Sequence, residues 1–171
     1  MKKNLILTGM MGVGKSTIAR LLATKLDRKF LDVDNLIEKN EKTSIKKIFE
    51  TNGEDFFRNL EKKTTLQILK KNNVIIALGG GAFINQVIRN KVLATCISFW
   101  LDMKVTELNK RLNLTNKANK RPLLLKKNYN DLDKIYNKRK KIYNLANFRI
   151  NCDKLKKEEI VRKILNIYEN L

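Results

Sequence analysis

The chain has 171 residues, a usual length for one domain, and its 43% hydrophobic content is enough for a core. It contains no histidine, which excludes histidine-based catalytic triads and zinc sites of the Cys/His kind. A general base must therefore be Asp, Glu, Lys or Tyr. The two cysteines, Cys96 and Cys152, form no CxxC pair, and we expect Cys96, in an apolar run, to be a buried packing residue.

The formal net charge is +20, which fits either a nucleic-acid-binding protein or a protein whose surface is simply rich in lysine. The lysines are spread along the chain and are not interleaved with aromatic residues, so the second interpretation is favoured. No apolar run has the length of a membrane span, and the amino-terminal run is too short for a signal peptide. We expect a cytoplasmic monomer that binds neither nucleic acid nor membrane.

Short apolar runs alternate with segments of helical period along the chain. The predicted strands are Leu5–Leu7, Phe30–Val33, Val74–Leu78, Thr95–Leu101 and Phe148–Ile150. The predicted helices are Lys15–Leu26, Ser44–Phe49, Glu54–Leu69 and Glu158–Leu171, with a turn at Asn52-Gly53. Alternation of this kind predicts one α/β domain over residues 1–171, in which helices cover both faces of a five-stranded parallel sheet. Ligands should bind at the carboxyl ends of the strands.

A phosphate-binding loop follows the first strand. The residues Gly9-Met10-Met11-Gly12-Val13-Gly14-Lys15-Ser16 fit GxxxxGK[ST], with a strand before them and a helix after them. Glycines let backbone N–H groups point at phosphates, and the helix amino terminus adds positive potential. Lys15 can reach the β- and γ-phosphates, and Ser16 can hold Mg²⁺. The expected ATP-binding residues of this loop are Gly12, Val13, Gly14, Lys15, Ser16 and Thr17.

Asp32 and Asp34 follow the second strand. Residues two apart on a strand share one face, so both carboxylates could point into one cleft. One could serve the metal, and the other could orient and deprotonate an attacking hydroxyl. Alternatively, Asp34 or Asn35 only caps the helix that follows.

Arg58 and Glu61 lie three apart on a predicted helix. They are either a surface pair or a clamp in which Glu61 holds Arg58 against a substrate carboxylate. Arg139 is another candidate, although it stands in a run of lysines, and the sequence alone favours a solvated face for it.

The run Gly79-Gly80-Gly81 closes the third strand and is expected where backbone N–H groups approach a ligand; a flexible turn is the alternative. The polar segment at about 112–125 has little apolar surface to anchor it, and we expect a mobile lid that brings Arg121 to the transferring phosphate. An ordinary polar surface loop is the alternative for that segment.

Together these motifs resemble the shikimate kinase family. The matching pieces are GMMGVGKST at Gly9–Thr17, FLDVD at Phe30–Asp34, SIKKIFETNGEDFFRNLE at Ser44–Glu61, the triple glycine, RL at Arg111-Leu112, RPLL at Arg121–Leu124 and RxxxY at Arg139–Tyr143. Their order and spacing both agree with the family. The resemblance implies a three-layer P-loop kinase fold and transfer of phosphate from ATP to the 3-hydroxyl of shikimate, with Mg²⁺ as cofactor, in aromatic amino acid biosynthesis.

The resemblance also implies roles for single residues. Asp34 corresponds to the residue that holds the reacting hydroxyl, and Arg58 and Arg139 to the pair that grips the substrate carboxylate. Gly79, Gly80 and Gly81 form the substrate loop, in which Gly80 and Gly81 contact the ring hydroxyls by their backbone.

On the nucleotide side, Asp32 resembles the carboxylate that joins Ser16 at the metal, and Arg111 resembles the residue that stacks on adenine. Arg121 resembles the lid arginine that reaches the ATP phosphates. The catalytic set implied is thus Asp34, Lys15 and Arg121.

Two other classes of protein share the phosphate-binding loop. A gluconate- or nucleoside-monophosphate-type kinase would need a different acceptor pocket, and the FRxxE, GGG and RxxxY motifs disfavour it. A basic P-loop module that binds nucleic acid would need clustered Lys and Arg with stacking aromatics.

Overall fold

A five-stranded parallel sheet forms the centre of the computed structural model, which describes residues 3–114 and 129–171. The strand order is β2-β3-β1-β4-β5. The strands are β1 (Asn4–Thr8), β2 (Lys29–Asp32), β3 (Val74–Ala77), β4 (Cys96–Asp102) and β5 (Phe148–Asn151). Every residue of β1 and β3 is buried, which explains why Leu5–Leu7 and Val74–Ala77 are apolar on both faces. The predicted α/β class and parallel sheet are confirmed.

Parallel pairing brings the chemically important strand ends to one edge of the sheet. Leu7 pairs with Ala77 on one side and Phe99 on the other, and Asp32 also pairs with Ala77. The loop after β1, the aspartate at the end of β2 and the glycines after β3 therefore emerge next to one another. The sheet thus positions the predicted phosphate loop and acceptor residues around one space.

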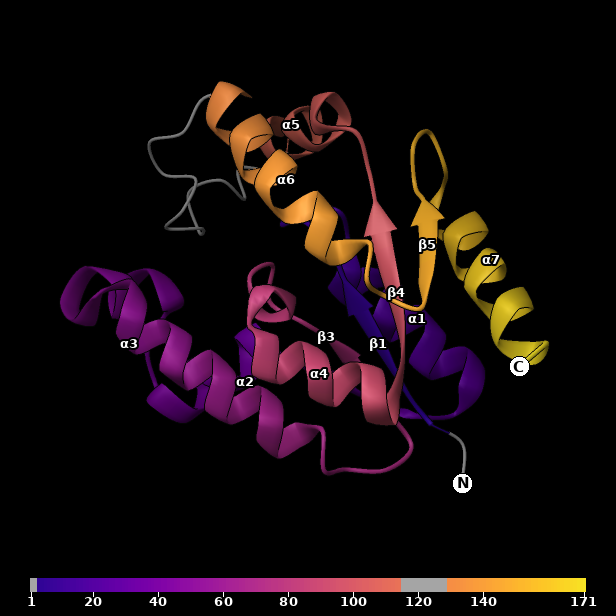
Figure 1. Cartoon of the computed structure of the whole chain (residues 1–171), viewed down its shortest axis with the longest axis horizontal. Helices are drawn as coiled ribbons and strands as arrows, with labels where there is room; N and C mark the ends of the chain where they lie inside the picture. Colours follow the sequence, from indigo (N-terminus) through magenta and orange to yellow (C-terminus); the bar gives the residue numbers. More distant parts are fainter. Residues whose placement is uncertain (1–2, 115–128) are drawn as a thin grey trace.

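Helices cover both faces of the sheet, with α4 in front of it and α1 behind it in Figure 1. α1 packs on the central strands and on α7, and α2 packs along α3. The helices are α1 (Lys15–Leu26), α2 (Val33–Glu41), α3 (Ile45–Ile68), α4 (Gln86–Thr95), α5 (Val105–Leu114), α6 (Tyr129–Tyr143) and α7 (Lys157–Glu169), and a 3₁₀ turn, η1, spans Ala82–Ile84. Within the described ranges no helix is both long and apolar enough to cross a membrane.

α3 bends at Gly53, whose φ of 81° and ψ of 176° are not helical. Ser44 starts the first half by accepting a hydrogen bond from the Lys47 amide at 3.2 Å. The second half carries Phe57, Arg58 and Glu61. The prediction of two helices separated by a turn at Asn52-Gly53 is confirmed, and the bend lets the second half run along the acceptor side of the pocket.

The largest buried side chains include Trp100, Tyr143, Phe83 and Phe99, which join β4, α6 and η1 in one core. Cys96 and Cys152 are also buried, at 3% and 0% exposed, and both are free. Burial raises the pKa of both thiols, that of Cys152 to about 12. They are packing residues, as expected for Cys96, because a protonated buried thiol is a poor nucleophile.

Candidate active site

The loop after β1 has the backbone of a phosphate-binding loop. Gly9 has a φ of 133°, and a Cβ there would lie 2.5 Å from the Leu101 carbonyl oxygen, so only glycine fits. Gly14, with a φ of 102°, leads directly into α1. Lys15 is only 9% exposed, and its Nζ donates to the carbonyl oxygens of Gly9 at 2.9 Å and Met10 at 3.0 Å. The loop therefore holds the ammonium group at its own centre.

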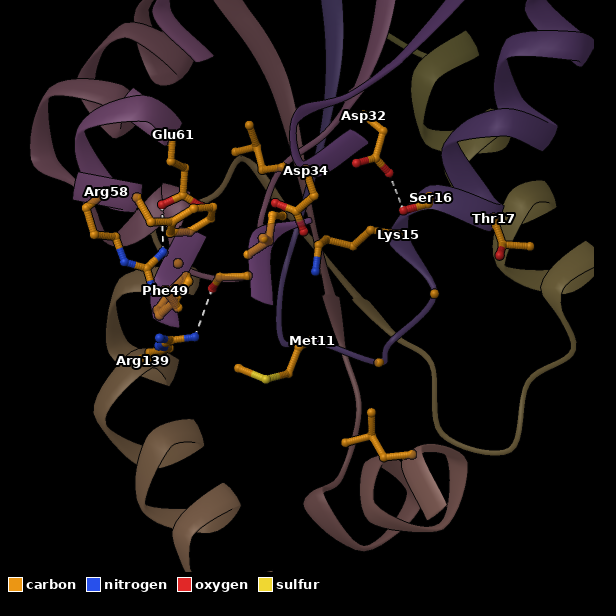
Figure 2. A pocket seen from close by; sticks show the side chains of 18 of the residues that line it. Met11, Lys15, Ser16, Thr17, Asp32, Asp34, Phe49, Arg58, Glu61 and Arg139 are labelled. Carbon is orange, nitrogen blue, oxygen red and sulfur yellow. Dashed lines mark hydrogen bonds and ion pairs between the residues drawn. The ribbon is translucent and has the colours of Figure 1, made fainter. Parts of the chain in front are cut away.

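Ser16 and Asp32 meet beside this loop. The Ser16 hydroxyl donates to Asp32 Oδ2 at 2.5 Å, and both residues line one pocket (Figure 2). Asp32 Oδ1 accepts from the Asn35 amide at 3.2 Å, which makes Asp32 the amino-terminal cap of α2. Hydroxyl and carboxylate oxygens are the ligands that Mg²⁺ prefers, so this donor set fits a magnesium ion.

The prediction that Asp32 and Asp34 share one face of a strand is wrong. Asp34 lies in the first turn of α2, not on a strand, so it does not share a strand face with Asp32. The cap considered for Asp34 or Asn35 is formed by Asp32. Asp34 nevertheless enters the same pocket as Asp32, because the chain turns into the helix at the end of β2. Asp34 is therefore a pocket residue and not the cap of α2.

The pocket has a volume of about 350 Å³ and joins the phosphate loop to the acceptor side. Figure 2 shows Lys15 and Asp34 in the middle, Ser16 and Asp32 on one side, and Arg58, Glu61 and Arg139 on the other. The predicted site residues that line it are Gly12, Gly14, Lys15, Ser16, Thr17, Asp32, Asp34, Arg58, Gly80, Gly81, Arg111 and Arg139. Val13 and Gly79 are not among the lining residues of this pocket, and Val13 lines the neighbouring hollow instead.

Arg58 belongs to an ion-pair network with one buried member, Glu61. Its Nη1 lies 2.7 Å from Glu61 Oε2, and Glu61 is only 2% exposed. The surface-pair interpretation is therefore wrong. Its Nε and Nη2 also donate to Glu54 Oε1 at 3.1 and 2.9 Å, a partner that the sequence analysis missed. The signal was available, because Glu54 stands one helical turn before Arg58.

The charges of this network interact with Lys15 of the phosphate loop. Burial raises the pKa of the Glu61 carboxyl, while Arg58, Arg139 and Lys15 act to lower it. Burial works against the charge of Arg58, but Glu61 and Glu54 outweigh it and raise its pKa. The acceptor side thus has a fixed guanidinium, held by a buried carboxylate that also faces Arg139 and Lys15.

Arg139 does not lie on a solvated face. Its Nη1 donates to the Gly80 carbonyl oxygen at 3.1 Å, and the Tyr143 hydroxyl donates to the same oxygen at 2.5 Å. Its neighbours in the sequence, Lys138 and Lys140, are exposed, which is why a run of basic residues gave the wrong expectation for Arg139 alone. Arg139 and Arg58 are thus brought to one pocket from α6 and α3.

The three glycines after β3 make room for the charged side chains. A Cβ on Gly79 would collide with Glu61 Oε1 and lie 2.7 Å from Asp34 Oδ1, and a Cβ on Gly81 would collide with the Arg58 guanidinium. A Cβ on Gly80 would lie 3.3 Å from the Met11 amide of the phosphate loop. This close packing disfavours the flexible-turn alternative. It also explains why glycine is needed at these positions even without the approach of a ligand to the backbone.

Two aromatic residues of α3 form an apolar wall that the sequence analysis did not assign to the site. Phe49 and Phe57 line the pocket, with ring centroids 4.8 Å apart. Phe57 was expected only as an apolar residue of the helix. Its position directly before Arg58 is the signal that could have placed it beside the pocket.

On the nucleotide side, Arg111 lines the main pocket and also a neighbouring hollow of about 410 Å³. That hollow is bounded by Gly14 and Thr17 and by Leu155 and Lys156, which precede α7. Arg121 and residues 115–125 of the predicted lid lie outside the described residues, and the lid stays a prediction.

These features define the chain as a protein with the P-loop kinase fold. The family model described as shikimate kinase matches residues 11–169. A shikimate kinase of Bacillus subtilis is 40% identical over 165 residues, which cover 96% of this chain and 88% of that protein. The chain belongs to the shikimate kinase family, whose members transfer phosphate to a shikimate hydroxyl.

Solved structures support the same family membership. The shikimate kinase of Acinetobacter baumannii in complex with shikimate has a TM-score of 0.92 at 31% identity, covering 99% of this chain and 94% of that one. A gluconokinase of Sinorhizobium meliloti has a TM-score of 0.60 at 14% identity, covering 98% of this chain and 94% of that one. The second likeness shows the fold alone.

Proposed function

We propose that this protein phosphorylates the 3-hydroxyl of shikimate with ATP, giving shikimate 3-phosphate for aromatic amino acid biosynthesis. The observation that carries the proposal is the meeting of Arg58 and Arg139 with Lys15 and Asp34 in one pocket. A phosphate loop alone would fit many nucleotide-binding proteins. Two arginines opposite it add a site for a small acceptor that carries a carboxylate.

ATP binds with its phosphates in the loop Gly9–Ser16, where Lys15 neutralises charge on the β- and γ-phosphates. Ser16 and Asp32 would hold Mg²⁺, which would offset the negative charge of the ATP phosphates. Arg111 stacks on adenine, because it borders the hollow beside Gly14 and Thr17. Arg121 reaches the transferring phosphate from the lid.

Shikimate binds with its carboxylate between Arg58 and Arg139 and its ring against Phe49 and Phe57. Glu61 holds Arg58 through the 2.7 Å ion pair, so this guanidinium is positioned before the substrate arrives. The backbone of Gly80 and Gly81 faces the pocket and contacts ring hydroxyls. Substrates without a carboxylate cannot pair with these two guanidinium groups and are disfavoured.

Asp34 orients the attacking hydroxyl and accepts its proton. No histidine competes for this role, and Asp34 lies between Lys15 and the two arginines (Figure 2). Phosphoryl transfer needs mainly in-line positioning and charge stabilisation, so proton removal is a smaller part of the rate than the alignment of the hydroxyl.

We also propose that the protein is a single-domain cytoplasmic monomer that needs no nucleic acid or membrane partner.

A coupled assay of ADP release with shikimate, gluconate and AMP as separate acceptors tests the proposal. We expect release with shikimate alone, and mass and NMR analysis of the product should place the phosphate on the 3-hydroxyl. Turnover with gluconate or AMP, or none with shikimate, would overturn the assignment.

A further inference from the structure

Helix α6 docks on β4 through two tyrosines that lie on one helical face. Tyr136 and Tyr143 are seven residues apart, or about two turns. The Tyr143 ring stacks on Trp100 with centroids 6.0 Å apart, and the Tyr136 hydroxyl donates to Asp102 Oδ1 at 2.8 Å. Trp100 and Asp102 are two apart on β4 and therefore share one face of the strand. The helix is thus fixed to the strand at two points.

Arg139 lies on the same face of α6, three residues after Tyr136 and four before Tyr143. Its guanidinium reaches the Gly80 carbonyl and the pocket, whereas Tyr136 and Asp102 do not line the pocket. Because Arg139 stands between the two docking points, a shift of α6 along β4 would move its guanidinium. The placement of Arg139 therefore depends on both tyrosine contacts, in addition to the packing of α6 on α5 and η1.

Asp102 is well suited to hold Tyr136. Its side chain is 8% exposed, and Arg149 of β5 donates to Oδ2 from Nε at 2.9 Å and from Nη2 at 2.6 Å. A buried carboxylate needs such a partner, and Arg149 also lies 4.9 Å over the Trp100 ring. Burial and the neighbouring Asp102 raise the pKa of Tyr136, so its hydroxyl stays a donor at neutral pH.

We propose that Tyr136, Asp102 and Arg149 are positioning residues for Arg139, and through it for the carboxylate of the acceptor substrate. This inference rests on the proposed function, in which Arg139 binds that carboxylate. None of the three residues lines the pocket. They fix α6 on β4 so that the Arg139 guanidinium meets the acceptor in one geometry, beside the guanidinium that Glu61 fixes on α3.

The test is Tyr136→Phe, which removes one hydroxyl and keeps the ring. We expect KM for shikimate to rise roughly five- to tenfold, because a hydrogen bond to a charged group is lost, while KM for ATP stays unchanged. Asp102→Asn should act in the same direction, since an amide has one oxygen for two sets of donors. Tyr168→Phe is the matched control: its hydroxyl accepts from Arg28 on the α7 side, away from the pocket, and its kinetics should stay normal.

A double-mutant cycle with Arg139→Ala separates positioning from plain stability. If Tyr136 acts through Arg139, Tyr136→Phe should cost nothing further in the Arg139→Ala background. Loss of kcat/KM by the same factor in both backgrounds would overturn the inference, as would normal kinetics of Tyr136→Phe. A wild-type enzyme that releases no ADP with shikimate would instead contradict the proposed function, so the two failures can be told apart.

Discussion

The phosphate side and the acceptor side of the pocket are built in opposite ways. The phosphate side is one continuous loop, Gly9–Ser16, whose lysine is held by its own backbone carbonyls. The acceptor side collects Asp34 from α2, Arg58 from α3, the glycines after β3 and Arg139 from α6. A local loop needs only its own residues to form the site, whereas the dispersed side needs supporting ion pairs and docking contacts to place each group.

This contrast predicts that damage to the phosphate loop, or to Asp34 and the glycine that makes room for it, affects turnover itself. Damage to the two acceptor-side arginines or to their supports affects the recognition of one substrate. Glu61 and Asp102 are such supports of the acceptor side, because each is a buried carboxylate that holds an arginine. Four substitutions test the contrast, from the largest expected effect to the smallest.

Lys15→Ala should abolish turnover. Lys15 lies at the centre of the phosphate loop and is only 9% exposed. Its removal leaves the β- and γ-phosphates without the ammonium group that would neutralise their charge. ADP release should fall to background while the thermal melting curve stays cooperative. Lys25→Ala, in the exposed last turn of the same helix, is the control and should be fully active. Near-normal turnover by a folded Lys15→Ala protein would remove the phosphate loop from the mechanism.

Asp34→Asn should lower kcat by a factor of about 10² to 10⁴, the usual cost of losing a general base. The amide keeps the shape and removes the charge, so KM for either substrate should change less than kcat. Asp55→Asn, at an exposed position of α3, serves as the control. A loss below about threefold, together with a lower melting temperature, would leave Asp34 only a favourable charge in the first turn of α2.

Gly79→Ala should lower kcat by roughly tenfold to a hundredfold, since misplacement of reacting groups by about 1 Å has effects of that size. The new methyl group would displace the carboxylates of Glu61 and Asp34, both ends of flexible side chains, so the fold should survive. Gly80→Ala is the comparison, because its Cβ would meet the Met11 amide of the phosphate loop instead. Equal kinetics for the two variants would mean that the glycines provide only backbone flexibility.

The sequence predicted the phosphate loop with the strand before it and the helix after it, because these parts follow one another in the chain, whereas Asp32 joins Ser16 from the end of β2. The five strands were also predicted within one or two residues of their observed ends, since buried parallel strands are apolar throughout. The helices α4, α5 and α6 were not predicted as elements.

The acceptor side was predicted only as alternatives. Burial of Glu61 and the turn of Arg139 toward Gly80 are decided by contacts between α3, α6 and the β3 loop, which helical period does not report. Family resemblance pointed to Arg58 and Arg139, which both line the pocket, whereas local reasoning favoured a solvated face for Arg139. The cap at Asp32 was missed for a smaller reason, because the helix begins one residue earlier than the strand pattern suggested.

The smallest kinetic effect is expected for Arg58→Lys, which keeps the charge and loses the planar fork. Arg58 spreads its donors over Glu61 and Glu54, and Glu54 is the more exposed partner at 50%. A substrate carboxylate would compete with Glu54 for the Nε and Nη2 donors of Arg58 while Nη1 stays paired with Glu61. A lysine has one ammonium group and cannot present a second, planar set of donors while it pairs with Glu61. KM for shikimate should therefore rise about tenfold, the equivalent of 1.4 kcal/mol, with KM for ATP and kcat nearly unchanged.

Initial rates with each substrate varied in turn measure this split. Arg20→Lys is the control, since Arg20 lies on the exposed side of α1 over the Phe30 ring. Shikimate methyl ester gives a second measurement, because esterification removes the charge that Arg58 and Arg139 are proposed to bind. The wild type should use the ester poorly, and Arg58→Lys should lose much less with the ester than with shikimate. An equal loss on both compounds, or equal changes in KM for ATP and shikimate, would mean that Arg58 supports the local fold and does not bind the carboxylate.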